Sequence, residues 1–460
     1  MTKRENTARI GAALVSLLVA TVLSLILPVR SQIGLSPRLD LSNAVDKAIE
    51  GNPITKSADS RVRIAEAKIR ESAAGKRPSF NFSQSVVRSN NPVFVFGSLL
   101  EQGRFGPSNF AIDSLNNPEG LFNFRTQVNG QMSLFDQRQT SSRISLAEIS
   151  KRQSVLMAEA ARQQLRFDVI KTYFGVILER NLVTVAVDAV KTAEANRKKT
   201  QDMVDVGMTN DADRLAAEVE LANAGQRKVE ADGQLITTLA SLNLTIGEKP
   251  DLDHELTGDL RERLFPVEDQ AELIRLALEN RPDYQRASLE IESSRVQKKS
   301  VRDQRLPRVE AFGNFGYSSP YVANGSTDYT IGMNLSYTLF DPGRKARIEQ
   351  AVEGEVLAGL ERDNLANQIR LDVIRSLQAF KTSEAKIRVS IKSIAQADEA
   401  LRIIDDRYKS GLTTFNEVLR ANSALVRAKQ DLMTTRYEYY VNFARLLLVT
   451  GRLDDVRWFD

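Results

Sequence analysis

The sequence of 460 residues contains no cysteine, one histidine and one tryptophan. Without cysteine there is no thiol nucleophile, no cysteine-based zinc site and no N-terminal cysteine to carry a lipid. His254 lies in a polar linker, and we expect it to be a bystander rather than a catalytic base. The sequence also contains no glycine-rich phosphate loop and no nucleophile elbow. We therefore predict that the protein is not an enzyme and uses no cofactor or metal.

Positive and negative charges are nearly balanced in the sequence. The chain has 63 Lys and Arg against 59 Asp and Glu, a formal net charge of +4. The first 31 residues hold four of those cations and one acid, which is +3, so the remainder is near +1. This balance gives no support to a nucleic-acid partner.

Residues 1–31 are predicted to be a secretory signal peptide. Lys3, Arg4 and Arg9 form a basic head, and a largely apolar stretch follows from Ile10 to Leu27. Cleavage after Ser31 is the favoured interpretation. The alternative is an uncleaved membrane anchor, because about 18 apolar residues come close to spanning a bilayer.

The segment 308–341 is predicted to form a β-hairpin. Its second half alternates strictly between apolar and polar residues, which is typical of a strand with one apolar and one polar face. Its first half is about 10 residues long, near the length of a tilted strand that crosses a bilayer. Pro320 and Asn324-Gly325 supply turn chemistry between the halves. This pattern is typical of a strand pair from an outer-membrane barrel. The residues of the apolar face are Tyr329, Ile331, Met333, Leu335, Tyr337 and Leu339.

A second hairpin is predicted over 79–136, and its closing strand, Leu121–Asp136, shows the same alternation. The loop 90–120 of this hairpin is long and rich in Gly, Pro and Asn, yet it also carries several phenylalanines. Two interpretations stay open for it, an ordered external cap or an adhesive surface loop.

The two halves of the chain repeat one another, which predicts an internal duplication of about 200 residues. Leu134-Phe135-Asp136 ends the first hairpin as Leu339-Phe340-Asp341 ends the second. The matching intervals are 25 residues for Pro53–Pro78 and Pro282–Pro307, and 40 residues for Gly207–Gly247 and Gly411–Gly451. The expected segments are a signal peptide (1–31), a first repeat (32–250), a linker in an equatorial belt (251–268), a second repeat (269–452) and a C-terminal tail (453–460). Each repeat would contain a helix, a β-hairpin, a long helix and a return helix.

Long coiled-coil helices are predicted after each hairpin. Asp341 is a suitable N-cap before Pro342, and a helix from there to Tyr408 would be roughly 100 Å long. Apolar residues recur at every seventh position, which favours coiled-coil packing. Glycine turns at Gly207 and Gly411 would join the antiparallel helices. The predicted stripes are Val176, Val183, Val190 and Val204; Met208, Leu215, Ala222, Val229 and Ile236; Phe380, Ile387, Ile394, Leu401 and Tyr408; and Leu412, Leu419, Val426, Met433, Tyr440 and Leu447.

Four strands cannot close a barrel, and an open sheet edge in lipid leaves backbone groups without hydrogen-bond partners. The edges must therefore pair with other copies of the chain, and three copies give twelve strands, enough to enclose a lumen. The predicted fold class is an α+β membrane protein: a trimeric 12-stranded β-barrel, with four strands from each chain, continuous with a long coiled-coil α-helical barrel. The apolar strand faces would contact outer-membrane lipid.

The chain resembles the TolC family of outer-membrane efflux proteins over about residues 40–452. The resemblance rests on the duplicated helix–proline–strand pattern, on the two Leu-Phe-Asp sequences, and on the two glycine turns, of which the second reads Gly411-Leu-Thr-Thr-Phe-Asn-Glu-Val-Leu. It implies a homotrimeric channel-tunnel of a tripartite efflux or type I secretion system in the outer membrane of a Gram-negative bacterium, extending into the periplasm. It also implies docking of the tips, Gly207-Met208-Thr209 and Gly411-Leu412-Thr413, to a periplasmic adaptor that joins the channel to an inner-membrane transporter.

The resemblance further implies an aperture at the periplasmic tip, held closed by polar contacts. Tyr408 and Asp213 occupy the positions of the family's contacting tyrosine and acid. Thr413 stands where the family has an arginine, Glu417 matches the first of two acids that ring the aperture, and Arg420 replaces the second. We expect Tyr408–Asp213 contacts to hold the tip and three Glu417 carboxylates to narrow it. The alternative for both acids is a solvated helix start, where carboxylates suit the helix dipole.

A periplasmic coiled-coil adaptor or scaffold is the alternative function. It would explain the heptad stripes and the signal peptide. It would not explain two amphipathic hairpins.

Overall fold

The computed structural model describes residues 38–454 and 456–459, so the predicted signal peptide lies outside the described residues. The chain divides into two units. The smaller unit pairs two short parallel strands, β1 (Arg38–Leu39) and β4 (Glu255–Leu256), with Arg38 opposite Glu255. The larger unit comprises residues 40–252 and 258–460 and carries the features that bear on function.

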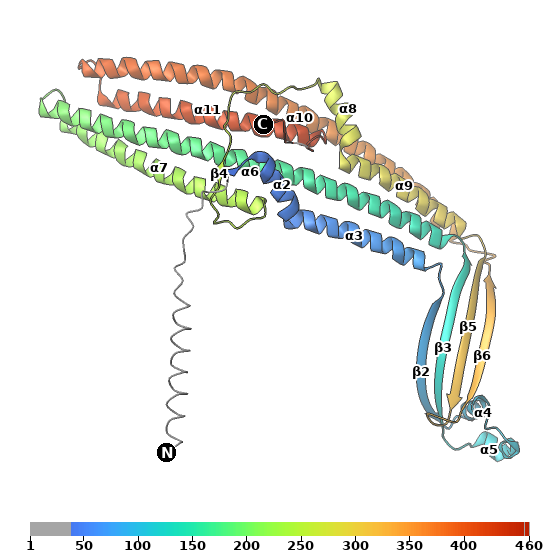
Figure 1. The fold of residues 1–460 in the computed structure, drawn as a ribbon. Coiled ribbons are helices and arrows are strands. Elements are labelled where there is room, and N and C mark those ends of the chain that lie inside the picture. The colour runs from blue at the N-terminus through green and yellow to red at the C-terminus, as the bar shows by residue number, and fades with distance from the viewer. Residues whose placement is uncertain (1–37, 455, 460) are drawn as a thin grey trace, which may run out of the picture. The chain divides into compact units, whose positions relative to one another are not determined.

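A four-stranded antiparallel sheet in the order β2-β3-β5-β6 is formed by the two predicted hairpins (Figure 1). β3 (Leu121–Asp136) covers the range that the alternation predicts, and it pairs with β2 (Ser79–Ser89) and β5 (Arg308–Ser319). β6 (Ser326–Ser336) ends before the predicted limit at residue 341. Within the described part of the chain, the outer edges of β2 and β6 have no partner strand.

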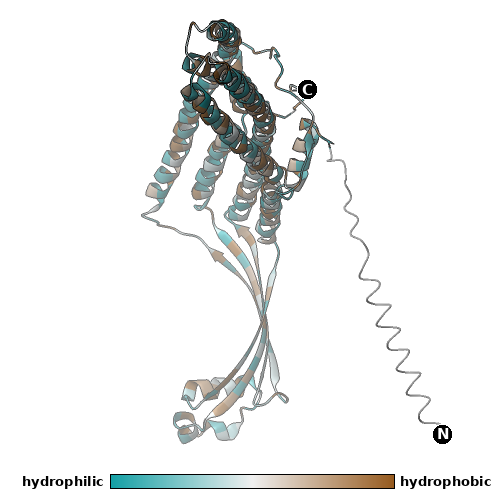
Figure 2. Cartoon of the chain, turned by 90° about the vertical axis from the view of Figure 1, so that its left-hand side faces the viewer, coloured by the Kyte–Doolittle hydropathy of each residue, from teal (hydrophilic) through white to brown (hydrophobic). Residues whose placement is uncertain are grey.

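The two faces of the sheet differ as predicted, and Figure 2 shows hydrophobic and hydrophilic residues alternating along the strands. Asn81, Asn129, Asn314 and Thr330 form one cross-strand row of the polar face. The alternation is interrupted by a register shift between Ser133 and Phe135, so Leu134 does not extend it regularly. Large apolar residues are exposed on the opposite face: Phe80, Phe82, Val86, Val128, Phe315, Tyr329, Ile331, Met333 and Leu335.

A pair of short helices precedes each hairpin. α2 (Leu41–Gly51) and α8 (Gln270–Asn280) each have 11 residues, and α3 (Pro53–Ala74) and α9 (Pro282–Asp303) each have 22. A proline at the first helical position begins both second helices, because its missing N–H has no intrahelical partner there. Asn52 caps α3 by accepting a hydrogen bond from the Ile54 N–H at 2.8 Å, whereas Arg281 supplies no side-chain cap to α9.

Four longer helices lie side by side in Figure 1. α6 (Gln139–Asp205) has 67 residues and is followed by α7 (Asp211–Thr245) with 35, while α10 (Arg344–Lys409) has 66 and is followed by α11 (Phe415–Val449) with 35. α3 packs on α6, α9 packs on both α6 and α10, and α11 contacts α10 and α6. None of the helices within residues 38–454 and 456–459 has the length and apolar composition of a membrane-spanning helix.

The start of α10 corrects the predicted cap. The helix begins at Arg344 rather than beside Asp341, and its N-cap residue is Gly343. The Asp341 carboxylate instead accepts a hydrogen bond from the Gly343 N–H at 3.1 Å and pairs with Arg347. The three residues before the helix thus form a turn that the side chain of Asp341 stabilises.

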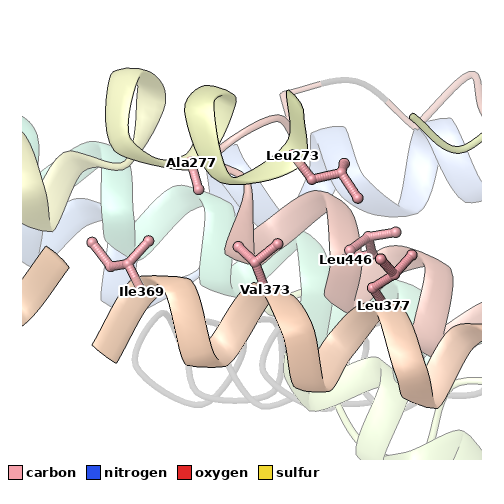
Figure 3. Packing of buried hydrophobic residues seen from close by; sticks show 6 residues of the cluster. All are labelled: Leu273, Ala277, Ile369, Val373, Leu377 and Leu446. Atoms are coloured by element: carbon pink, nitrogen blue, oxygen red, sulfur yellow. The ribbon is translucent and has the colours of Figure 1, made fainter. Parts of the chain in front are cut away.

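The core lies where short helices meet long ones. In Figure 3, Leu273 and Ala277 of α8 pack against Ile369, Val373 and Leu377 of α10 and Leu446 of α11. In a second, aromatic region, the ring of Phe265 in the linker stacks on Phe443 of α11 with centroids 4.1 Å apart. The end of the linker is therefore packed against the helices.

The heptad stripes are partly wrong in phase. On α10 the predicted residues Phe380, Ile387 and Tyr408 are buried. On α11 the predicted residues Tyr440 and Leu447 are buried, but the stripe that is buried along the whole helix lies one residue before the predicted one and keeps the step of seven: Val418, Leu425, Leu432, Tyr439 and Leu446. On α7 the buried residues are Ala217, Ala224 and, near the helix end, Leu242 and Asn243. Most of the predicted stripe is exposed: Met208, Leu215, Val229 and Ile236.

Residues 90–120 form helical structure, which agrees with the ordered alternative for this loop. α4 (Pro92–Glu101) is followed by a 3-10 turn, η1 (Pro107–Phe110), and by α5 (Ile112–Asn116). The Phe105 ring lies between those of Phe96 and Phe110, edge to face, with centroid distances of 4.9 and 5.0 Å. These rings join η1 to α4.

Candidate aperture and docking tips

The two turns at the far ends of the long helices have the same backbone structure. Gly207 has φ +73° and Gly411 has φ +72°, and a side chain at either position would meet no atom within 4 Å. Glycine is therefore favoured by its backbone conformation and not by lack of space. Met208 N–H donates to Met203 O at 2.8 Å, and Leu412 N–H donates to Arg407 O at 2.9 Å. Both are the long hydrogen bonds of a Schellman helix end.

The starts of the return helices differ. Asn210 caps α7 by accepting from the Asp213 N–H at 3.1 Å, and the Thr209 hydroxyl lies 2.5 Å from the Asp213 carboxylate. Thr414 is the N-cap residue of α11 but makes no side-chain capping bond. The carboxylate of Asp213 is thus held at its own helix start by Thr209, as expected where it meets the positive end of a helix dipole.

Tyr408 lies between the two helical hairpins, α6–α7 and α10–α11, with 3% of its surface exposed. It belongs to a cluster with Phe415 and Val418 of its own hairpin and Ala217 of the other. Burial raises the pKa of its phenol, and the Asp213 and Asp405 carboxylates act in the same direction. Tyr408 lies near Asp213, but among the described residues no hydrogen bond of good geometry reaches its hydroxyl, so the predicted Tyr408–Asp213 contact is not made in the single chain.

An ion pair that the sequence did not single out joins the hairpins. Lys199 of α6 pairs with Asp405 of α10, and Asp405 also contacts Lys409 at 2.8 Å. The Lys199 ammonium lies 5.4 Å from the centroid of the Tyr408 ring. Burial opposes ionisation of Asp405, but hydrogen bonds from both lysines outweigh it and lower the pKa of the carboxyl. No sequence signal marks this pair, because charged residues are frequent along both helices.

The two remaining predicted aperture residues pair with each other. Glu417 and Arg420 form an ion pair of 3.0 Å one turn apart on α11, and Arg420 is largely exposed. Thr413, at the position where an arginine was expected, is half buried beside the turn. Positive charge near the tip therefore comes from residues such as Lys199, Lys409 and Arg420 and not from position 413.

Apolar side chains are exposed at both tips. Val206 and Met208 flank Gly207, and Leu412 follows Gly411; all three have more than half of their surface exposed. Met203, Val206 and Met208 also line a shallow groove with Lys198 and Lys409. Isolated exposed apolar residues are ordinary, but three gathered at two neighbouring turns are typical of a contact surface.

Comparison with known proteins gives a consistent result. The family described as "Outer membrane efflux protein" matches residues 44–248 and 273–452. The outer membrane efflux protein BepC of Brucella suis is 22% identical over 90% of this chain and 85% of its own length. The alkaline protease secretion protein AprF of Pseudomonas aeruginosa is 22% identical over 64% of this chain and 62% of its own length. The crystal structure of the Campylobacter jejuni CmeC outer membrane channel superposes with a TM-score of 0.73 at 17% identity, covering 90% of this chain and 85% of CmeC, and so shares the fold.

Proposed function

This chain belongs to the outer membrane efflux protein family, and from that premise we propose that three copies assemble into one channel. The observation that carries the proposal is a sheet with one exposed apolar face, whose two outer edges have no partner strand in the part of the chain that the structure describes. In lipid such a sheet needs partner strands at both edges, and β2 of one copy can pair with β6 of the next. Three sheets then close a barrel of twelve strands whose polar faces line the lumen.

The protein is an outer-membrane channel of an efflux or type I secretion system. The alternative of a coiled-coil adaptor leaves the amphipathic four-stranded sheet without a role. Relatives include both an efflux protein and a protease secretion protein, so the transported substrate class stays open within the family.

Internal duplication of the chain is the second part of the proposal. Corresponding helices of the two halves have equal or nearly equal lengths, as given above. The helix ends also correspond: a Cβ at Gly247 would come within 3.0 Å of the Gly51 backbone, and one at Gly451 within 2.8 Å of the Asn280 backbone. In both halves a left-handed glycine at the end of the return helix packs against the break between the short helices, which supports a common origin.

We assign the exposed stripe of α7 to the contact between copies. Leu215, Val229 and Ile236 are separated by multiples of seven residues, so they share one face of the helix. Their exposure in a single chain would place a long apolar strip in water. A neighbouring copy in a closed helical barrel would cover it.

Closure of the tip is proposed to depend on the contacts between hairpins. Lys199–Asp405 supplies the charged link, and Tyr408 supplies the buried contact near Asp213. Three Glu417 carboxylates, each partly neutralised by Arg420, would narrow the opening. The exposed tips around Gly207-Met208-Thr209 and Gly411-Leu412-Thr413 would dock a periplasmic adaptor, which in turn joins an inner-membrane transporter.

The decisive experiment is the oligomer mass of the mature protein in detergent together with its conductance in planar bilayers. We expect the mass of three chains and discrete single-channel steps. A water-soluble monomer that gives no conductance would contradict the assembly. Tyr408→Phe removes only the hydroxyl and serves as a variant that should still assemble, because the buried ring contacts are kept.

A further inference from the structure

The helix α4 is fastened to the polar face of the sheet. Gln102, which follows α4, donates to Phe122 O at 2.8 Å and to Asn123 Oδ1 at 3.1 Å. Glu101 forms an ion pair of 3.1 Å with Arg125 and accepts from the Ser318 hydroxyl at 3.3 Å. All three partner side chains, Asn123, Arg125 and Ser318, belong to the polar face by strand register. The helix therefore covers the face that would line the lumen.

Arg125 is the centre of this attachment. Besides Glu101 of α4, it contacts Asp328 of β6 at 3.1 Å and donates to Ser318 of β5 at 3.0 Å. Its side chain lies over Gly316, where an added Cβ would come within 3.0 Å of both the Arg125 guanidinium and the Asp328 carboxylate. One guanidinium thus joins α4 to three neighbouring strands, in the forked geometry that arginine favours.

The opposite side of α4 is apolar and exposed. Val95, Ser98 and Gln102 are buried on the side that meets the sheet. Val93, Phe96 and Leu100 follow the same spacing of three and four residues on the other side, and all are exposed. The aromatic contacts between Phe96, Phe105 and Phe110 extend this apolar surface to η1. An apolar surface turned away from the wall of a barrel faces the barrel axis.

We propose that α4, η1 and α5, here called the outer lid, meet their counterparts from the other two copies on the axis and close the external mouth of the channel. The partner is a second copy of this chain, because the exposed stripe is apolar and turned inward rather than toward lipid. The inference rests on the proposed trimer. The Arg125 contacts hold each lid against its own wall, and the Val93–Phe96–Leu100 stripes pack together between the lids.

The chain has no cysteine, so single cysteines report contacts between copies directly. Phe96→Cys and Leu100→Cys are each introduced into the full-length protein, and the purified oligomer is oxidised with copper phenanthroline. We expect a disulfide-linked dimer on a non-reducing gel from both variants. Val86→Cys is the matched control, because Val86 is exposed on the apolar outer face of β2 and the barrel wall separates it from its counterparts.

Arg125→Gln tests the attachment in the Phe96→Cys background. Loss of a half-exposed ion pair should lower the cross-linked fraction by about fivefold and raise single-channel conductance. The lid proposal fails if neither cysteine cross-links although the protein has the mass of three chains, or if Val86→Cys cross-links equally. A monomer mass would instead overturn the trimer itself, so the two failures are distinguishable.

Discussion

The helical hairpins α6–α7 and α10–α11 have nearly the same dimensions, but their return helices, α7 and α11, differ in which side chains are buried. α11 buries large side chains along its length, including Leu425, Leu432 and Phe443. α7, of equal length, buries only Ala217 and Ala224 over most of its length, and Leu242 and Asn243 near its end, while Leu215, Val229 and Ile236 are exposed. α11 contacts helices of both hairpins, whereas α7 contacts chiefly α6.

This difference shows that a repeated sequence pattern need not give two equivalent halves. Alanines let α7 approach α6 closely but provide little apolar area, so that hairpin gains less from burial within the chain. In the proposed trimer, a neighbouring copy would cover the exposed stripe of α7. The α10–α11 hairpin would then gain its apolar burial from its own chain, and the α6–α7 hairpin would gain part of its burial from the neighbouring copy.

The largest expected effect is a difference in the free energy of unfolding between two leucine substitutions, one on each return helix. Leu446→Ala, at a position with 1% exposure, should lower the free energy of unfolding by about 3 kcal/mol or more, because it leaves a cavity in the core. Leu215→Ala, at 52% exposure on α7, should lower the free energy of unfolding of the dissociated chain by about 1 kcal/mol or less, because its burial is proposed to come from a neighbouring copy. Urea denaturation followed by helical circular dichroism, at a protein concentration where the mass in detergent is that of one chain, measures both. Equal losses would abolish the contrast between the hairpins.

Substitutions on the exposed face of α7 should affect the association of copies more than the stability of the single chain. Ile236→Glu is expected to weaken each contact between copies by about 2 kcal/mol, since a carboxylate would replace an apolar side chain at the contact. The mass in detergent should move toward one chain while the helical content is kept. Thr237→Glu, on the neighbouring exposed position, is the control and should leave the mass unchanged.

Breaking the Lys199–Asp405 ion pair between the helical hairpins should have a smaller effect, on channel opening. Asp405→Asn removes the charge that Lys199 contacts and should loosen the tip by about 1 kcal/mol, seen as a several-fold rise in open-channel frequency. Asp406→Asn is a close control, because Asp406 pairs with Arg402 and Lys409 of its own helix. If both variants conduct alike, the link does not hold the tip.

The same carboxylate predicts a pH dependence. The pKa of Asp405 is lowered in the folded protein. The contribution of its ion pairs to stability is therefore fully present above the pKa that Asp405 has in the unfolded chain, and it is lost as the pH falls through the pKa in the folded protein. Between pH 5 and 8 the wild-type conductance attributable to this contact should be constant, and it should rise only below about pH 4. Asp405→Asn should lack that rise.

The smallest effect is expected at Glu417. Glu417→Gln removes one carboxylate per copy, but Arg420 already offsets it at 3.0 Å, so cation conductance should fall only slightly. Arg420→Ala frees the carboxylate and should increase cation preference by more. Reversal potentials in a salt gradient compare the two. A cation preference that neither substitution alters would remove Glu417 from the aperture.

Much of the fold could be predicted from the sequence because its signals are local. Alternation gave the range of β3 and the polar face around Thr330, and the glycines at 207 and 411 gave both turns. The phase of the heptads could not be predicted on α11, because Val418 and Leu419 are both apolar and a step of seven fits either stripe. On α7 the burial of alanines depends on close helix packing, which composition does not reveal.

The candidate site could be predicted only in part. Tyr408 and Asp213 were identified by their positions relative to the glycines, and the structure places them near each other. The Lys199–Asp405 pair joins residues 206 positions apart, and no periodicity links them. The attachment of Arg125 to Glu101 likewise depends on a loop that folds back over the sheet, which turn-forming residues alone do not predict.

The length of α6 has a mechanical consequence. A helix of 67 residues is about 100 Å long, so a rotation of about 3° at the strand end moves the opposite end by about 5 Å. Such a displacement exceeds the reach of an ion pair. A slight tilt where the helices leave the sheet would therefore be enough to separate Lys199 from Asp405, and long uninterrupted helices act as levers that amplify small movements at their base.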